Sequence, residues 1–209
     1  MQTADAVTSR DDSPVERTPI RPLAWLLVVG GAIGLGAALV LTQDKVTLLQ
    51  DKVDGKESSF ACDLSAWVSC SSVIGSDQSS AFGFPNSFLG IVGFTIVVVL
   101  GVLYAAQREL PEFVWAGLQA GVVFAIGFIT WLQYQSIVEI NALCPYCMVV
   151  WTVTIPIFVY VTRRNLQTWA PANAVTRFVT NWHGLVVALW YVAVVAAIWF
   201  GFGDRLFIT

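Results

Sequence analysis

Charged residues and histidine are scarce in this sequence. Only 12% of its 209 residues are charged, and there is one histidine, whereas soluble proteins carry about 25% charged residues. With a net charge of −3 and no basic face, the chain lacks the footprint of a nucleic-acid-binding protein. A single histidine also cannot supply both axial ligands of a bis-histidine haem. The composition is 56% hydrophobic with a mean hydropathy of +0.71, which indicates a membrane protein.

Five long apolar runs divide the chain. Each has about the length that a helix needs to cross a bilayer. The runs are uninterrupted and lack the strict alternation of a transmembrane barrel, which leaves helices as the spanning elements. We therefore predict an all-α integral membrane protein with five transmembrane helices. The runs are 23–42, 88–106, 113–135, 144–162 and 184–202.

The distribution of lysine and arginine predicts the orientation in the membrane, because these residues favour the cytoplasmic side. With the N-terminus inside, we expect a cytoplasmic tail (1–22), an outer loop (43–87), a cytoplasmic loop (163–183) and a short outer C-terminus after the fifth helix (184–209). This arrangement predicts a multi-pass protein of the inner (cytoplasmic) membrane. The inner set is Arg10, Arg17, Arg21, Arg108, Arg163, Arg164 and Arg177, and the outer set is Lys45, Lys52, Lys56 and Arg205.

Four cysteines form two pairs, and the predicted topology puts both pairs at the outer face. Cys144 and Cys147 open the fourth run as Cys-Pro-Tyr-Cys, a spacing that brings the Cβ atoms to about 5–6 Å on a helix. The positive end of the helix dipole there favours thiolate. Cys62 and Cys70 lie in the outer loop. On one continuous helix their Cα atoms would be about 12 Å apart, beyond the limit of about 7 Å for a disulfide. Either the loop folds back, or the two do not always pair.

Four cysteines can also serve other purposes. Two inert structural disulfides would make the chain a non-enzymatic membrane protein. A Cys₄ zinc site needs closer spacing than Cys62 and Cys70 have. Met148 follows the second motif cysteine where c-type haem attachment requires histidine, and no βαβ pattern surrounds the motif as a glutaredoxin fold would require. The spacing favours a membrane redox centre without metal or haem.

The cysteines belong to a larger framework that resembles the vitamin K epoxide reductase family. The resemblance runs from the first to the fourth helix, residues 23–162. It implies a four-helix transmembrane bundle around a quinone of the menaquinone, ubiquinone or vitamin K type, to which this chain adds a fifth helix. The residues that carry the resemblance are Cys62-Asp63, Cys70-Ser71, Asn86-Ser87 and Cys144-Pro145-Tyr146-Cys147.

The resemblance implies a quinone-dependent thiol–disulfide oxidoreductase that supports disulfide formation. Its partner would be a secreted or periplasmic thioredoxin-like thiol oxidase acting in trans. Electrons would enter at Cys62, pass from Cys70 to Cys144, and leave from Cys147 to the quinone. An alternative is the unrelated disulfide-bond protein B type, whose Cys-x-x-Cys lies in the first outer loop.

Two further residues are implied to contact the quinone ring. Asn86 would donate a hydrogen bond to a carbonyl, although an asparagine at this place suits a helix cap equally well. Trp151 stands where the animal enzymes have a tyrosine, four residues after the second motif cysteine. Its N–H replaces a hydroxyl as the donor.

Overall fold

The structure, a computed structural model, describes residues 20–56, 60–65 and 67–206. Within these ranges the regular elements are all helical, and five helices are long and apolar enough to cross a membrane. The prediction of five spans is therefore confirmed. Most of the expected tail, 1–22, lies outside the described residues. The spans are Pro22–Asp54, Ser87–Ala105, Glu112–Ile140, Pro145–Trp169 and Ala174–Gly203.

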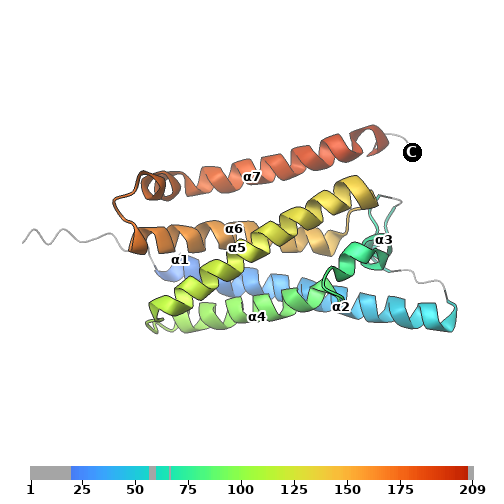
Figure 1. The fold of residues 1–209 in the computed structure, drawn as a ribbon, viewed down its shortest axis with the longest axis horizontal. Coiled ribbons are helices and arrows are strands. Elements are labelled where there is room, and N and C mark those ends of the chain that lie inside the picture. The colour runs from blue at the N-terminus through green and yellow to red at the C-terminus, as the bar shows by residue number, and fades with distance from the viewer. Residues whose placement is uncertain (1–19, 57–59, 66, 207–209) are drawn as a thin grey trace, which may run out of the picture.

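Figure 1 shows the long helices as continuous coiled ribbons, and two of them contain a short π-helical turn. The first span joins three segments, and the third continues from an α-helix into a π-helical turn. The elements in chain order are α1 (Ile20–Trp25), the π-turn η1 (Leu26–Gly30), α2 (Gly31–Asp54), α3 (Cys70–Gly75), the 3₁₀ turn η2 (Asp77–Ser80), α4 (Asn86–Ala105), α5 (Glu112–Tyr134), the π-turn η3 (Gln135–Ile140), α6 (Pro145–Trp169) and α7 (Ala174–Leu206).

The helix ends follow local sequence signals. α2 runs out to Asp54 and is stopped by Gly55, whose φ of 69° favours glycine. Pro145 occupies the first turn of α6, where its missing N–H costs nothing. We expected one polar loop over 163–183. Instead α6 continues to Trp169 and α7 begins at Ala174, so that most of this segment lengthens the two helices.

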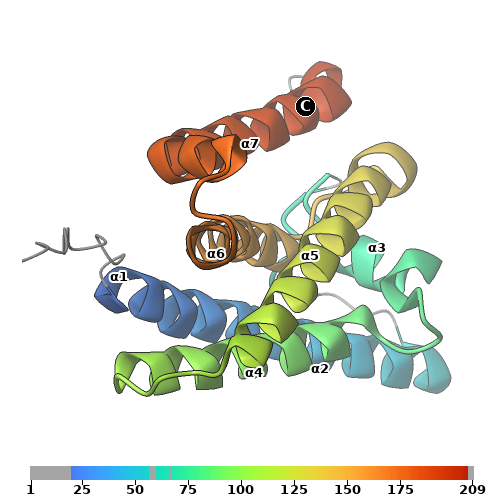
Figure 2. The ribbon, with the colours of Figure 1, turned by 60° about the vertical axis from the view of Figure 1, so that its left-hand side comes forward.

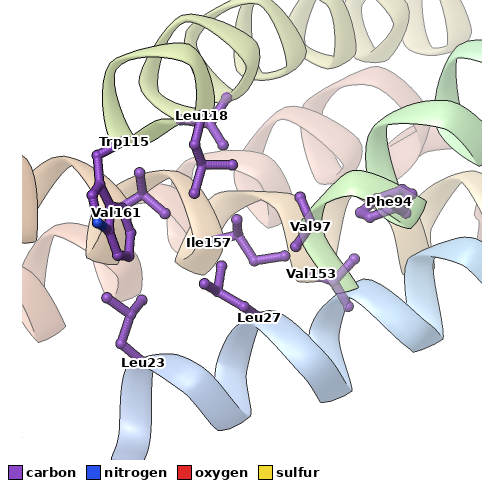
Figure 3. Packing of buried hydrophobic residues seen from close by; sticks show 10 residues of the cluster. Leu23, Leu27, Phe94, Val97, Trp115, Leu118, Val153, Ile157 and Val161 are labelled. Atoms are coloured by element: carbon purple, nitrogen blue, oxygen red, sulfur yellow. The ribbon is translucent and has the colours of Figure 1, made fainter. Parts of the chain in front are cut away.

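Four helices share one apolar core (Figure 3). Leu27, Val97, Trp115 and Ile157 are buried in it, one each from η1, α4, α5 and α6. Small residues bring the first span and α4 together: a Cβ on Gly101 would lie 2.8 Å from Leu27 Cβ and 2.9 Å from Val28 N. Close packing of this kind drives helix association in lipid, where the solvent is as apolar as the core.

α7 lies to one side of the other four spans (Figures 1 and 2). It packs against α6 and, near its C-terminal end, against η3. Phe202 makes the deepest contact of α7. Its side chain is 1% exposed and belongs to a cluster with Ile137 of η3 and Trp151 of α6. The fifth span thus supports the turn that precedes the Cys-x-x-Cys motif.

A polar junction ties α5 to α6 at the end of the bundle opposite the cysteines. Asn165 is 1% exposed, and its Nδ2 donates to the Trp115 carbonyl at 3.2 Å and to Gln119 Oε1 at 3.0 Å. Arg164 donates to Asn165 Oδ1 at 3.0 Å and forms an ion pair with Glu112. Each of the two polar groups of the Asn165 amide has a partner, which fixes the two helices in register.

Candidate redox site

The outer loop folds back on itself and joins Cys62 to Cys70. The two form a disulfide with a Cα–Cα distance of 5.7 Å. The described residues between them form no helix, and α3 begins at Cys70. Of the two arrangements that the sequence left open, the structure has the folded-back loop.

Asp63 holds this loop in shape. Its Oδ1 accepts hydrogen bonds from the Ser69 hydroxyl at 2.9 Å and the Ser71 N–H at 3.0 Å, and its Oδ2 accepts from the Phe60 N–H at 3.0 Å. Burial alone would raise the pKa of Asp63, but these bonds outweigh it and lower the pKa below its usual value. The carboxylate next to Cys62 therefore stabilises the folded conformation of the disulfide loop.

Two backbone hydrogen bonds align the two cysteine pairs. The Leu143 N–H donates to the Trp67 carbonyl at 2.8 Å, and the Ser69 N–H donates to the Leu143 carbonyl at 3.0 Å. They form an isolated parallel bridge between Val68 and Leu143. Cys144 directly follows Leu143, and Cys70 comes two residues after Val68. Their sulfur atoms lie 3.6 Å apart, although 74 positions separate them in the chain.

Cys144 and Cys147 are both free thiols at the start of α6. Cys144 is fully buried and is the residue that precedes the first turn. Its sulfur contacts that of Cys70, and Cys147 packs against the cluster that contains it. Donors at a helix N-terminus stabilise a thiolate. Cys144 thus has one neighbour on each side: the disulfide at Cys70 and the thiol of Cys147.

A cavity of about 410 Å³ lies behind Cys147. Its walls come from α2, α3, η2, α4, α5, η3 and α6, and none of the described residues of α7 lines it. Most of the lining is aliphatic or aromatic, as in sites that bind ring compounds. Polar groups interrupt it at a few places. They are Lys45, Ser76, Gln78, Ser79, Asn86, Ser87, Gln135, Ser136, Cys147 and Thr154.

Asn86 and Trp151 both line this cavity. The Asn86 amide spans the turn before α4: Nδ2 donates to the Gln78 carbonyl at 2.7 Å, and Oδ1 accepts from the Ala81 N–H at 3.1 Å. Trp151, one turn beyond Cys147, is 4% exposed. The structure therefore brings all six residues of the sequence prediction to one end of the bundle, and three of them, Cys147, Asn86 and Trp151, to one cavity.

Two residues of the cavity wall were missed by sequence reasoning. Lys45 reaches across from α2 and donates to the Ile74 carbonyl at 2.6 Å and to the Ser79 hydroxyl at 2.8 Å. Gln135 begins η3. Its Oε1 is buried without a hydrogen-bond partner among the described residues. The position of Lys45 just after an apolar run does indicate a residue near the membrane surface. No sequence pattern predicts the π-turn at Gln135.

The arrangement is a dithiol placed between a disulfide and an apolar cavity. Its sulfur atoms are spaced for thiol–disulfide exchange, which needs one thiolate and one accessible sulfur at each step. In the described part of the chain, no cluster of three or more His, Cys, Asp or Glu side chains is arranged to hold a metal ion.

Residues 25–162 match the sequence model of the vitamin K epoxide reductase family. The match spans more than half of the chain and includes all four cysteines, so the chain belongs to this family, as the cysteine framework predicted. Membership makes the protein a membrane thiol–disulfide oxidoreductase whose chemistry is linked to quinones. No curated protein sequence matches the chain at a significant level.

Proposed function

We propose that this protein oxidises a thioredoxin-like protein outside the cytoplasm and passes the electrons to a membrane quinone. The observation that carries the proposal is the 3.6 Å separation of the Cys70 and Cys144 sulfurs. It connects an outer disulfide to a dithiol on a cavity wall. Exchange between the pairs requires those sulfurs to close to about 2.05 Å, a shift within the reach of side-chain rotation.

The first step takes place at the outer pair. A partner dithiol reduces the Cys62–Cys70 disulfide, so that the partner gains a disulfide and Cys62 and Cys70 become thiols. Cys62 receives the attack, and the mixed disulfide with the partner resolves when the partner's second thiol displaces Cys62. The hydrogen bonds of Asp63 to the loop favour re-formation of the Cys62–Cys70 bond.

The second step moves the electrons inward. Cys70 thiolate attacks Cys144 in a Cys144–Cys147 disulfide and releases Cys147 as thiolate. Cys62 then attacks Cys70, which re-forms the outer disulfide and frees Cys144. The product of this step has the sulfur bonding seen in the structure, one outer disulfide and two inner thiols.

The third step takes place at the cavity. Cys144 and Cys147 give up two electrons and two protons and return to a disulfide, while a bound quinone becomes a quinol. Cys147 is the thiol on the cavity wall, and Cys144 resolves it. Asn86 is placed to donate a hydrogen bond to a ring carbonyl, because an amide nitrogen carries two hydrogens and Gln78 accepts only one. Trp151 packs beside the ring.

The direct test is quinone reduction by the purified protein in detergent, followed by absorbance, with a reduced thioredoxin-like protein as electron source. We expect Cys62→Ala and Cys147→Ala each to lower turnover to background. With a small dithiol as electron source, Cys62→Ala should recover turnover, and Cys147→Ala should not.

Two outcomes would contradict the proposal. Full turnover in Cys147→Ala would remove that thiol from the route to the quinone. A wild-type protein that reduces no quinone, and whose Cys62–Cys70 bond resists mild reductant, would instead favour structural disulfides.

The proposal includes an orientation. The four cysteines lie at one end of the bundle, and the predicted topology puts that end on the outer side of the inner membrane, with the N-terminus in the cytoplasm. In intact cells treated with a reductant that cannot cross the membrane, a maleimide that also cannot cross it should label Cys62. Labelling only after the cells are opened would reverse the orientation and place the partner in the cytoplasm.

A further inference from the structure

The polar groups of the cavity wall fall into two sets according to whether they already have partners. Lys45, Ser79 and Asn86 lie on the side formed by α2, η2 and α4, and each is hydrogen-bonded within the protein. On the side formed by α5, η3 and α6, Thr154 donates to a carbonyl of its own helix at 2.7 Å. Gln135 is the exception, because its Oε1 is buried with no partner among the described residues.

A buried and unpaired amide oxygen costs about 1–3 kcal/mol. Gln135 lines the same cavity as Cys147 and Trp151, where rotation of its amide would bring the unpaired oxygen to a donor on a bound molecule.

The backbone changes its helical form at Gln135. η3 is a π-turn at the end of α5, and turns of this kind are frequent at functional sites. A π-turn holds one residue more than an α-turn, so the side chains after it are rotated by roughly 100° from their α-helical direction. Within the turn, Gln135, Ser136 and Ile140 line the cavity, while Ile137 packs in the neighbouring cluster with Phe202 of α7.

We infer that Gln135, which comes from another wall of the cavity than Asn86, is the second hydrogen-bonding residue for the quinone ring. The inference rests on the proposed function. A 1,4-quinone carries its two carbonyls on opposite sides of one ring, and the two amides come from different walls. Asn86 and Gln135 would each hold one carbonyl, and Trp151 would serve as a packing surface.

A glutamine suits both redox states of the ring. Its Nε2–H donates to a quinone carbonyl, and its Oε1 accepts from the hydroxyl of a quinol. Rotation of the terminal amide exchanges the two atoms. The same residue can therefore hold substrate and product without a change of charge in an apolar cavity.

The test is binding of 2-methyl-1,4-naphthoquinone to full-length protein in detergent, followed by quenching of tryptophan fluorescence. Gln135→Met keeps the length of the side chain and removes both hydrogen-bonding atoms. We expect it to raise the Kd about 3- to 10-fold, the effect of one neutral hydrogen bond. Gln133→Met is the matched control. Gln133 also has a buried, unpaired amide atom and is 7% exposed, but it does not line the cavity, so its Kd should stay at the wild-type value.

Infrared spectra separate a contact with the ring from a packing effect. With ¹³C at one ring carbonyl at a time, each C=O band reports its own hydrogen bond. Gln135→Met should raise the frequency of one carbonyl band, and Asn86→Leu should raise that of the other. If Gln135→Met does not fold, as judged by near-ultraviolet circular dichroism, Gln135→Leu takes its place.

The outcomes separate the two proposals. An unchanged Kd and unchanged bands in Gln135→Met, in a protein whose wild type reduces the quinone, would overturn the role of Gln135 and leave the oxidoreductase standing. A shift of the same band in both variants would likewise overturn the assignment of two carbonyls to two walls. A wild-type protein that binds the probe but does not reduce it would contradict the proposed function and leave Gln135 as a ring-binding residue.

Discussion

The two ends of the helix bundle both contain polar groups inside an apolar protein, but they differ in how their central groups are paired. At the end near Asn165, both polar groups of the Asn165 amide are hydrogen-bonded, to Trp115 and Gln119 of α5 and to Arg164 of α6, although Nε of the neighbouring Arg163 is buried without a partner among the described residues. At the cysteine end, two sulfurs lie at non-bonded distance, and Gln135 has an unpaired oxygen. Saturated polar junctions fix a structure. Groups that are close but incompletely paired are free to react or to bind. The cysteine end of the bundle is therefore the end suited to chemistry.

The largest effect is expected from breaking the contact between the cysteine pairs. Cys144→Ser should lower turnover with the thioredoxin-like partner to background, because the sulfur that accepts electrons from Cys70 is gone. The Cys62–Cys70 disulfide should still exchange with the partner, which non-reducing gels after acid quenching would show. Turnover above a tenth of the wild-type rate would mean that electrons bypass Cys144.

The second largest effect is expected from removing the contact of α7 with the cysteine end of the bundle. Phe202→Ala should lower the free energy of unfolding in detergent by about 3 kcal/mol, the usual loss for a buried phenylalanine. It should also raise the KM for quinone, because Phe202 packs with Ile137 of η3 and with Trp151. Phe200→Ala is the control, since that side chain is 86% exposed and should change neither quantity. Equal effects of the two variants would show that α7 only fills space in the bilayer.

A smaller effect should dissociate stability from binding. Asn165→Leu leaves the Trp115 carbonyl and Gln119 Oε1 without their donor. We expect a loss of about 1–3 kcal/mol in the free energy of unfolding, measured by thermal or denaturant melts, with an unchanged Kd for quinone. Gln135→Met should show the reverse pattern. Weaker quinone binding in Asn165→Leu would mean that the two ends are coupled. It would contradict the view that the Asn165 end affects stability alone.

The smallest effect concerns pH at the outer loop. The pKa of Asp63 is lowered in the folded protein, so its contribution is present above the ordinary pKa of about 3.9 and is lost as the pH falls through the lower, folded value. At pH 7, Asp63→Asn should speed reduction of the Cys62–Cys70 bond by a phosphine about threefold, since charge-assisted hydrogen bonds become neutral ones. The ratio of the two rates should fall toward one only as the pH drops below the ordinary value and through the lowered pKa of Asp63. A ratio that does not change with pH would show that the carboxylate charge does not hold the loop.

Much of the fold was predictable because it follows from hydropathy. Five apolar runs gave five spans, and Pro145 marked the start of α6. The segment 163–183 differed, because its polar residues extend α6 and α7 where we expected a loop. Polar composition is compatible with helix that projects beyond the bilayer, so hydropathy marks where apolar runs end and says little about where helices end.

The sequence named several residues of the candidate site but not its geometry. The Cys-x-x-Cys spacing singled out Cys144 and Cys147, since reactive dithiols use that spacing at a helix start, and the family resemblance added Cys62 and Cys70. The pairing of Cys62 with Cys70 was left open by the sequence, because it depends on a loop closed by Asp63 and Ser69. The position of Gln135 depends on a π-turn, which has no sequence signature of its own.

The sequence by itself determined that the chain is a bundle of membrane helices with paired thiols, because hydropathy and the spacing of reactive residues are local properties. Only the tertiary structure decided which sulfurs meet and which polar groups stay unpaired. The contact of Cys70 with Cys144 needs a backbone bridge between residues far apart in the chain. Such contacts arise from closure of the whole fold, and no local pattern specifies them.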